Sequence, residues 1–207
     1  TYRMRPDGSH AEYVTHGQVN PFGLAFDPLG NLYSCDCHSR PIYQLLRGAW
    51  YPSFGKPHDG LGFGPEMCFH DHGSTGIAGI VYYAANQFPK PFHDNIFIGN
   101  VVTSRINRDT VSWSGSSPRA VEQPDFLVSD DPWFRPVDLE LGPDGALYVA
   151  DFYNKIIGHY EVPLTHPGRD RERGRIWRIV YRGPEAGPDR SPRQDFSTAQ
   201  NAELVED

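Results

Sequence analysis

The feature that most constrains the fold is an internal repeat. Residues 20–43 align without a gap with residues 135–158, and both copies place a Pro- and Gly-containing turn between two short apolar stretches. Proline presets φ at the second position of such a turn, and glycine supplies the positive φ that closes it. The repeat therefore predicts two hairpins of one design, with these matched positions: Pro21 and Pro136, Pro28 and Pro143, Gly30 and Gly145, Leu32-Tyr33 and Leu147-Tyr148, Asp36 and Asp151, Ile42 and Ile157.

A weaker third copy lies between them at residues 94–108, where Asn100 takes the position of Asp36. Hairpins that recur at roughly fifty to sixty residues, separated by long loops at 47–76 and 109–134, are typical of β-propeller blades. We therefore predict an all-β fold, a partial β-propeller of about three four-stranded blades. A β-sandwich with similar turns is the alternative.

Three blades cannot close a ring, because propellers typically have four to eight. The remaining blades are expected from the same polypeptide or from another chain. Residues 1–183 are assigned to the partial propeller. Residues 184–207 are assigned to a Pro/Gly-rich linker and the start of a helix, with Ser197 or Thr198 as its N-cap.

Composition agrees with a β fold and excludes one class of partner. The chain has 21 Gly, 19 Pro and 13% aromatic residues, which suits short strands joined by tight turns. Its formal net charge is −7, so it has no basic field to hold a nucleic-acid backbone, and we expect no nucleic-acid partner. No apolar run approaches the ~18 residues of a membrane helix, and the first residues lack a signal-peptide layout.

The motif "SCDCHSR" at residues 34–40 resembles a haem-attachment sequence but is one residue short of Cys-x-x-Cys-His. Attachment needs that spacing, so we expect no haem bound to this chain. Within the motif, Asp36 occupies the same blade position as Asn100 and Asp151. Polar side chains of several blades could converge there.

The segment "MCFHDHG" at residues 67–73 adds two histidines, His70 and His72, which would point to one face of an extended segment. With Asp36, Cys37 and His38 they form a candidate transition-metal set, because imidazole and thiolate suit zinc or copper. The alternatives are hydrogen-bonded loop histidines and buried thiols. A disulfide from Cys68 to Cys35 or Cys37 is a further alternative.

Two loops carry other candidate binding features. Residues 166–175 form a dense run of alternating charges, which we interpret as a solvated loop with local ion pairs rather than a site for an acidic partner or an anionic saccharide. Residues 47–67 are rich in aromatic side chains that would suit stacking on sugar rings, or packing as a lid over the blades.

Residues 125–179, and also 36–67 and 70–83, resemble a known family. It is the propeller of large bacterial proteins described as membrane-bound dehydrogenases, the PVC-type haem-binding group, related to glucose/sorbosone dehydrogenase-like propellers. The resemblance implies six blades and an exported, periplasmic and membrane-associated protein. It also implies that helical-repeat and c-type haem domains accompany the propeller.

The resemblance further implies descent from sugar dehydrogenases that hold pyrroloquinoline quinone and a calcium ion at the axial mouth of the propeller. Asn20 and Arg135 carry over as cofactor-binding residues. Val19 stands where those enzymes have an arginine, and residues 99–104 contain no lysine. Because the carboxylates of the quinone need Arg or Lys partners, we do not expect it to bind in the usual way.

The resulting hypothesis is a dehydrogenase that oxidises a sugar or alcohol. His70 or His72 would be the general base, and electrons would pass through a cofactor to the haem domain. Asp138 is a third candidate catalytic residue, since a carboxylate stands where the first repeat has Gly23. The competing hypothesis is a non-catalytic scaffold that binds carbohydrate or a protein partner through its loops.

Overall fold

The computed structural model describes residues 1–56, 62–158, 161–184 and 186. Within these ranges the chain is almost entirely strand and loop, with one short 3-10 helix, and no described helix has the length and apolar character needed to cross a membrane. The elements are β1 (Tyr2–Arg3), β2 (Glu12–Tyr13), β3 (Pro21–Phe26), β4 (Leu32–Asp36), β5 (Ile42–Gln44), β6 (Ile77–Tyr82), η1 (Lys90–Phe92), β7 (Asn95–Asn100), β8 (Arg105–Ser114), β9 (Ser117–Val128), β10 (Pro136–Leu141), β11 (Leu147–Asp151) and β12 (Arg175–Ile179).

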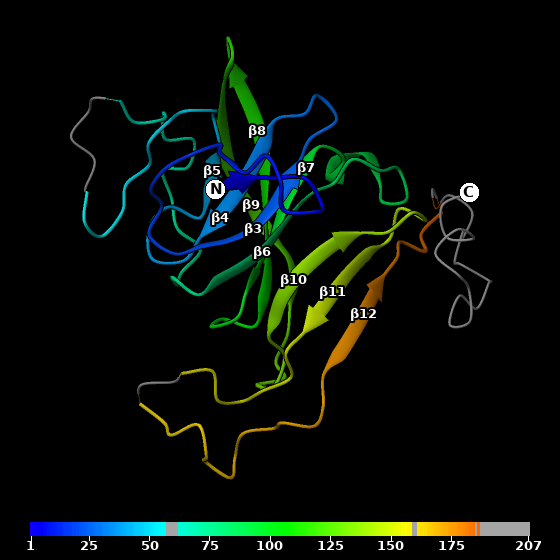
Figure 1. Cartoon of the computed structure of the whole chain (residues 1–207). Coiled ribbons are helices and arrows are strands. Elements are labelled where there is room, and N and C mark those ends of the chain that lie inside the picture. Colours follow the sequence, from blue (N-terminus) through cyan, green and yellow to red (C-terminus); the bar gives the residue numbers. More distant parts are fainter. Residues whose placement is uncertain (57–61, 159–160, 185, 187–207) are drawn as a thin grey trace.

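Three antiparallel sheets form successive blades (Figure 1). Their strand orders are β3-β4-β5, β6-β7-β8-β9 and β10-β11-β12, each in chain order, while β1 and β2 form a separate small hairpin. The first two strands of the repeat are confirmed, because β3 matches β10 and β4 matches β11 at both ends. The predicted match of Ile42 with Ile157 is wrong, because Ile42 begins β5 whereas Ile157 lies in the loop before β12. The structure is the predicted partial β-propeller.

The strand count differs from the prediction in two blades. The β6–β9 sheet has four strands, whereas the other two have three each within the described residues. After β5 the described chain forms turns and isolated bridges, including one between His16 and Trp50, in place of a fourth strand. This segment contains several prolines and glycines, which interrupt a hydrogen-bonded ladder.

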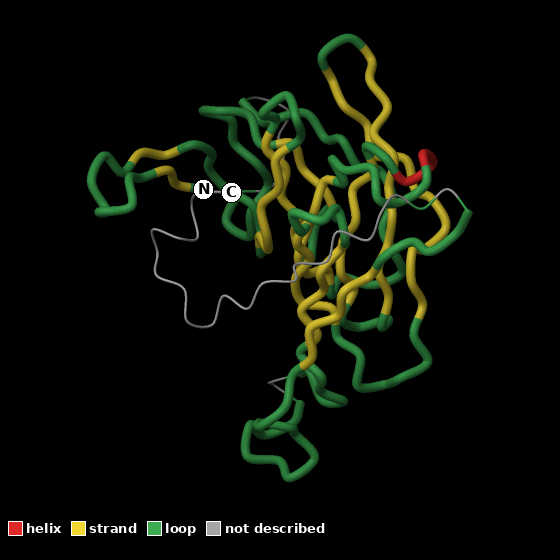
Figure 2. Tube along the Cα trace, turned by 90° about the vertical axis from the view of Figure 1, so that its right-hand side faces the viewer, coloured by secondary structure: helices red, strands yellow, loops and turns green. Residues whose placement is uncertain are grey.

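The innermost strands of the three blades, β3, β6 and β10, lie side by side with β6 in the middle. Each is interrupted by a bulge two or three residues from its start, between Phe22 and Leu24, between Ala78 and Ile80, and between Pro136 and Asp138. Figure 2 shows most of the strands in the centre of the molecule, while one long hairpin projects at the top and a short strand pair lies near the N-terminus. A bulge increases the local twist, which helps each blade to turn away from its neighbour.

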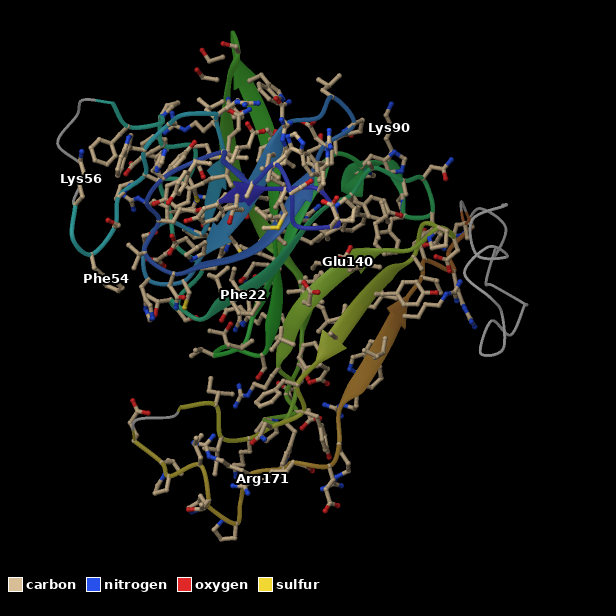
Figure 3. The ribbon with its side chains drawn as sticks, viewed as in Figure 1. Phe22, Phe54, Lys56, Lys90, Glu140 and Arg171 are labelled. Atoms are coloured by element: carbon tan, nitrogen blue, oxygen red, sulfur yellow. The ribbon has the colours of Figure 1, made fainter. Side chains whose placement is uncertain are left out.

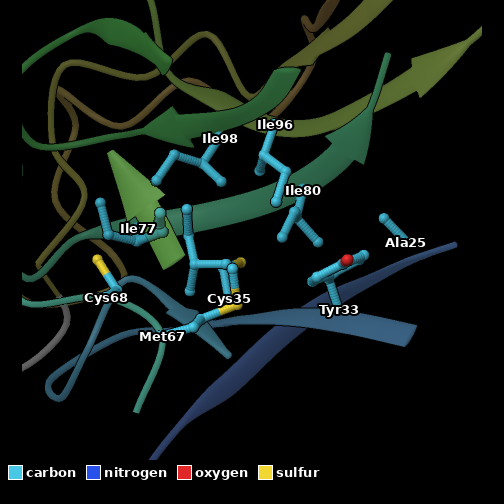
Figure 4. Close-up of a cluster of buried hydrophobic side chains, with 11 residues drawn as sticks. Ala25, Tyr33, Cys35, Met67, Cys68, Ile77, Ile80, Ile96 and Ile98 are labelled. Atoms are coloured by element: carbon cyan, nitrogen blue, oxygen red, sulfur yellow. The ribbon is translucent and has the colours of Figure 1, made fainter. Parts of the chain in front are cut away.

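Two apolar layers lie between the blades, and a third, smaller cluster around Tyr43, Leu45 and Tyr51 lies at the first blade. The first joins the β3–β5 and β6–β9 sheets and contains Tyr33, Cys35, Ile80, Ile96 and Ile98 (Figure 4). The second joins the β6–β9 and β10–β12 sheets through side chains that include Phe97 and Leu139. Burial of apolar surface between the sheets, at about 25 cal/mol per Å², therefore fixes the order of the blades.

Candidate functional site

The structure brings two of the predicted histidines together around a carboxylate that the sequence did not single out. His70 Nε2 lies 2.8 Å from Asp109 Oδ1, and His72 Nε2 lies 2.9 Å from Asp109 Oδ2. The two imidazole rings meet edge to face, with centroids 4.9 Å apart. The segment that carries both histidines thus lies against β8, which supplies Asp109.

The three residues differ in their access to solvent. The side chains of Asp109 and His72 are 0% and 1% exposed, whereas that of His70 is 20% exposed. His70 is therefore the member of the group that a ligand can reach. Cys68 adjoins it, with its Sγ atom 3.6 Å from His70 Nε2.

A second carboxylate stands beside His72. Glu122 of β9 pairs directly opposite Asp109 of β8, and its Oε1 lies 3.5 Å from His72 Nδ1. Burial disfavours the charged imidazole, but the hydrogen bond with Asp109 and the negative charges of Asp109 and Glu122 raise the pKa of His72 above its ordinary value. The site therefore favours a positive charge between the two strands.

The remaining predicted metal ligands lie elsewhere. Asp36, at the end of β4, accepts hydrogen bonds from the backbone N–H groups of Val19 and Asn20, at 2.9 and 3.1 Å. Among the described residues, one group has metal-ligand atoms that all lie within 4.8 Å of one another: His70, His72 and Asp109. Asp36, Cys37 and His38 are not part of this group. His38 is exposed and has a positive φ of 89°, which places it in a turn.

The cysteines form no disulfide. All three are free, so neither of the bridges considered from the sequence is present. Burial raises the pKa of Cys35, and burial with the charge of Asp36 raises the pKa of Cys37. The thiol is the stable form of both residues.

The blade position shared by Asp36, Asn100 and Asp151 proves to be structural. All three side chains are buried at the end of the second strand of a blade. Asp151 Oδ1 accepts the N–H of Arg135 at 2.8 Å, and Asn100 Nδ2 donates to the carbonyl of His72 at 3.2 Å. Each of the three thus fixes the chain that leads into the innermost strand of its blade.

Arg135 holds two loops together. Its guanidinium donates to the carbonyl oxygens of Asn154, Val101 and Lys155, at 2.9, 2.7 and 3.2 Å, and to the hydroxyl of Ser104 at 3.2 Å. These bonds join the loop after β7 to the loop after β11. The guanidinium does not fit the role of partner to a quinone carboxylate, since four of its five N–H groups are engaged in this way.

The other two candidates lie apart from the histidines. Asn20 is exposed just before β3, with its backbone held by Asp36. Asp138 is exposed on β10, packed against Gly79 of β6, where a side-chain carbon on the glycine would meet the backbone of Asp138. Asp138 is not among the residues that surround Asp109.

Both loops noted in the sequence make internal contacts, although Phe54 of the aromatic loop is 82% exposed. In the charged run, Arg173 pairs with Asp170 at 2.6 Å, and Arg169 donates to the carbonyl of Val162 at 2.7 Å. Figure 3 shows Arg171 on this loop at the bottom of the view, and Phe54 and Lys56 on the aromatic loop at the upper left. Lys56 Nζ lies 4.7 Å from the ring centroid of Trp50.

A pocket of about 290 Å³ opens beside the histidine segment, between the first and second blades. Ligand pockets in proteins usually measure about 300–1,000 Å³, so this pocket has the volume of the smallest of them. Its polar lining combines hydroxyl groups, carboxylates and one arginine, a set that can hydrogen-bond a polyol: Asp36, Ser39, Arg40, Asp71, Ser74 and Thr75.

Several solved structures that are similar to this chain are described as sugar dehydrogenases. The PQQ-bound aldose sugar dehydrogenase of Streptomyces coelicolor matches 86% of this chain and 51% of its own length, at 19% identity and a TM-score of 0.58. The soluble aldose sugar dehydrogenase of Escherichia coli, in its apo form, matches 71% of this chain and 46% of its own at 23% identity and a TM-score of 0.53. An oxidoreductase of Thermus thermophilus, described as a glucose dehydrogenase, matches 82% and 47% at 18% identity and a TM-score of 0.59.

These similarities define the chain as a β-propeller of the sugar-dehydrogenase type in its fold. It spans about half the length of the structures that it matches. The chain belongs to the family described as "Domain of unknown function (DUF7133)", whose model matches residues 1–183. No curated protein matches it.

Proposed function

We propose that this chain is part of a dehydrogenase that oxidises a hydroxyl group of a sugar or alcohol, with His70 taking up the hydroxyl proton. The supporting observation is that Asp109 lies between two imidazoles, of which that of His70 is partly exposed. The negative charge of a carboxylate 2.8 Å from one nitrogen of His70 stabilises the imidazolium formed when the other nitrogen accepts a proton. His72, which is buried, would hold Asp109 in place.

For the electron acceptor we propose only its chemical class, a redox cofactor. The S. coelicolor relative binds PQQ, and the family resemblance adds calcium for the propeller and a c-type haem domain beyond it. In this chain Arg135 is engaged with loop carbonyls and Val19 replaces an arginine, so the usual quinone contacts are incomplete. We therefore derive no step through the quinone, and propose a redox cofactor or domain beyond the described residues, in a protein exported to the periplasm. A catalytic part for Asp138 stays a prediction.

A second candidate is a non-catalytic propeller that binds carbohydrate. The pocket between the first two blades favours it, because its hydroxyl and carboxylate lining matches a polyol without any redox chemistry. Asp71, which is exposed and lines this pocket, lies between His70 and His72 in the sequence. In an extended segment it would point away from them, so pocket and histidines occupy two sides of one segment.

The test is a dehydrogenase assay with an artificial electron acceptor, a panel of sugars and alcohols, and PQQ with calcium either present or absent. We expect His70→Gln to lower kcat by about 10²- to 10⁴-fold, the usual contribution of a histidine base, with little change in KM. His166→Gln is the matched control, because His166 is exposed on the loop after β11.

Two results would contradict the proposal. One is oxidation that is unchanged in His70→Gln. The other is the absence of oxidation together with saccharide binding that Asp71→Asn weakens, which would establish the binding scaffold in its place.

A further inference from the structure

We propose that His70, His72 and Asp109 bind one divalent transition-metal ion, with zinc as the reference metal. The inference concerns the site of the proposed function, but metal binding can be measured whether or not a sugar is oxidised. Two imidazoles and a carboxylate are ligands that zinc accepts, and three protein ligands leave a coordination position open. That open position is the mark of a catalytic rather than a structural zinc site.

The donor atoms are already close together. The ligand atoms of the three residues all lie within 4.8 Å of one another, and both Nε2 atoms face the carboxylate of Asp109 at 2.8 and 2.9 Å. At zinc bond lengths of about 2.0–2.2 Å, two ligands of one ion are no more than ~4.4 Å apart. Small rotations of the imidazoles are therefore enough to admit the ion.

One buried atom of the group lacks the partner that burial requires. Asp109 Oδ1 is shielded from solvent and has no hydrogen-bond partner, although His70 Nε2 lies 2.8 Å away as an ion-pair contact. A buried acceptor without a partner costs free energy. Coordination to a cation would satisfy this oxygen.

The charges around the group also favour a cation. Asp109 and Glu122 stand directly opposite each other on β8 and β9, and like charges in that arrangement are destabilising. His72 lies between them, with Nε2 toward Asp109 and Nδ1 toward Glu122. A carboxylate on the outer nitrogen of a metal-bound histidine is the usual second contact of such sites, since it fixes the ring and its tautomer.

A metal held here would make His70 a ligand rather than a base. Metal ions lower the pKa of a coordinated hydroxyl, so a substrate hydroxyl bound to the ion would release its proton to solvent water, while its two electrons would go to the redox cofactor proposed above. The ligand would enter from the side of His70, the partly exposed member of the group.

The experiment is a zinc titration of chelator-treated protein in competition with a chromophoric chelator, followed by the visible spectrum of the cobalt-substituted protein. We expect one zinc ion per chain and a cobalt spectrum without thiolate bands, because Cys68 is outside the group of ligands. Glu122→Gln should weaken zinc binding about 10- to 100-fold, as is usual for such outer contacts. His70→Gln and Asp109→Asn should lose the site.

Asp71→Asn is the matched control, since it removes a carboxylate from the same segment at an exposed position outside the group, and zinc binding should be unchanged. If Asp109→Asn fails to fold, His70→Gln decides, because its side chain is partly exposed. Zinc binding equal in wild type and His70→Gln, or lost equally in Asp71→Asn, would overturn the inference. Zinc binding at this site without sugar oxidation would support the metal site and reject the proposed dehydrogenase function. Sugar oxidation by a protein that binds no zinc here would support the dehydrogenase function and reject the metal site.

Discussion

At the scale of single residues, the last residue of the second strand has a buried polar side chain in every blade described, but its hydrogen-bonding role differs between blades. Asp36 and Asp151 accept backbone N–H groups there, whereas Asn100 donates to the carbonyl of His72 and to Asn107 Oδ1, both at 3.2 Å. The oxygen of Asn100 accepts from Ser74 and from the backbone of Thr103. The amide is thus required in the second blade because its surroundings offer acceptors as well as donors.

This difference predicts the effect of Asn100→Asp. A carboxylate would face the carbonyl of His72 and the oxygen of Asn107 and would lose both donated bonds, so we expect a loss of about 1–3 kcal/mol in the free energy of unfolding. Urea unfolding followed by circular dichroism measures it. Asn86→Asp, at an exposed position, should change stability by less than about 0.5 kcal/mol, and equal effects of the two variants would refute the argument.

A second residue-scale prediction concerns acid stability. Burial opposes ionisation of Asp144, but the hydrogen bond and charge of Arg178, with the N–H of Ala146, lower the pKa of Asp144 below its ordinary value. A lowered pKa in the folded state adds stability above the unfolded value of about 3.9, and this stability is lost as the pH falls through the folded value.

We therefore expect Asp144→Asn to be less stable than wild type at pH 6 and the two to converge as the pH falls below about 4. Urea midpoints at pH 6 and pH 3 test this. Asp130→Asn, at an exposed carboxylate, should stay close to wild type at pH 6. If the difference in urea midpoint between wild type and Asp144→Asn became larger at pH 3 than at pH 6, the lowered pKa assigned to Asp144 would be wrong.

At the scale of elements, one glycine of β7 sets how closely this strand approaches the innermost strands β6 and β10. A side-chain carbon on Gly99 of β7 would meet the carbonyl oxygens of Pro136 and Ala78. These are backbone atoms of β10 and β6, which cannot move without separating the second and third blades. Glycine is therefore needed at position 99 because a larger residue would not fit, and not because the backbone has a positive φ there.

We expect Gly99→Ala to lower the free energy of unfolding by about 1–3 kcal/mol, the usual cost of forcing extra atoms into a packed core. Gly55→Ala is the control, because nothing lies within 4 Å of the added carbon there. Thermal unfolding of both variants measures the difference. A melting temperature for Gly99→Ala equal to that of Gly55→Ala would show that the strands can separate freely.

The repeat also shows what the sequence could and could not predict. The strands β3, β4, β10 and β11 follow from turn residues a few positions away, so they could be placed from the sequence. Asp109 could not, because its contact with His72 joins residues 37 positions apart in the chain. The available signal was the alternation in β8 that puts Asn107 and Asp109 on one side of the strand, both of them buried.

At the scale of the whole molecule, the outer blades carry exposed apolar side chains. Leu24 and Phe26 of β3 are 54% and 64% exposed, and Ile176 of β12 is 72% exposed. Matching structures have about twice the length of this chain. We propose that further blades, from the same polypeptide or another, cover these side chains.

Residues 1–183 expressed alone should therefore self-associate, since exposed apolar patches of this kind promote association. The double variant Leu24→Ser, Phe26→Ser should reduce association with little change in unfolding temperature. Light scattering coupled to size-exclusion chromatography measures both proteins. A monomeric wild-type segment would show that these side chains need no cover.

The matched strand bounds of the first and third blades indicate that the chain grew by duplication of an ancestral hairpin. In both blades the turn between the first two strands has kept its length, at residues 27–31 and 142–146, whereas in the second blade it has lengthened to residues 83–94 and acquired η1. The second blade, whose sheet also supplies Asp109 and Glu122, thus differs from the other two in its first turn. The third blade differs instead in the connection between its second and third strands, which spans residues 152–174 against 37–41 in the first blade. Each blade can therefore gain its own chemistry through a different connection, while the paired strands keep their places.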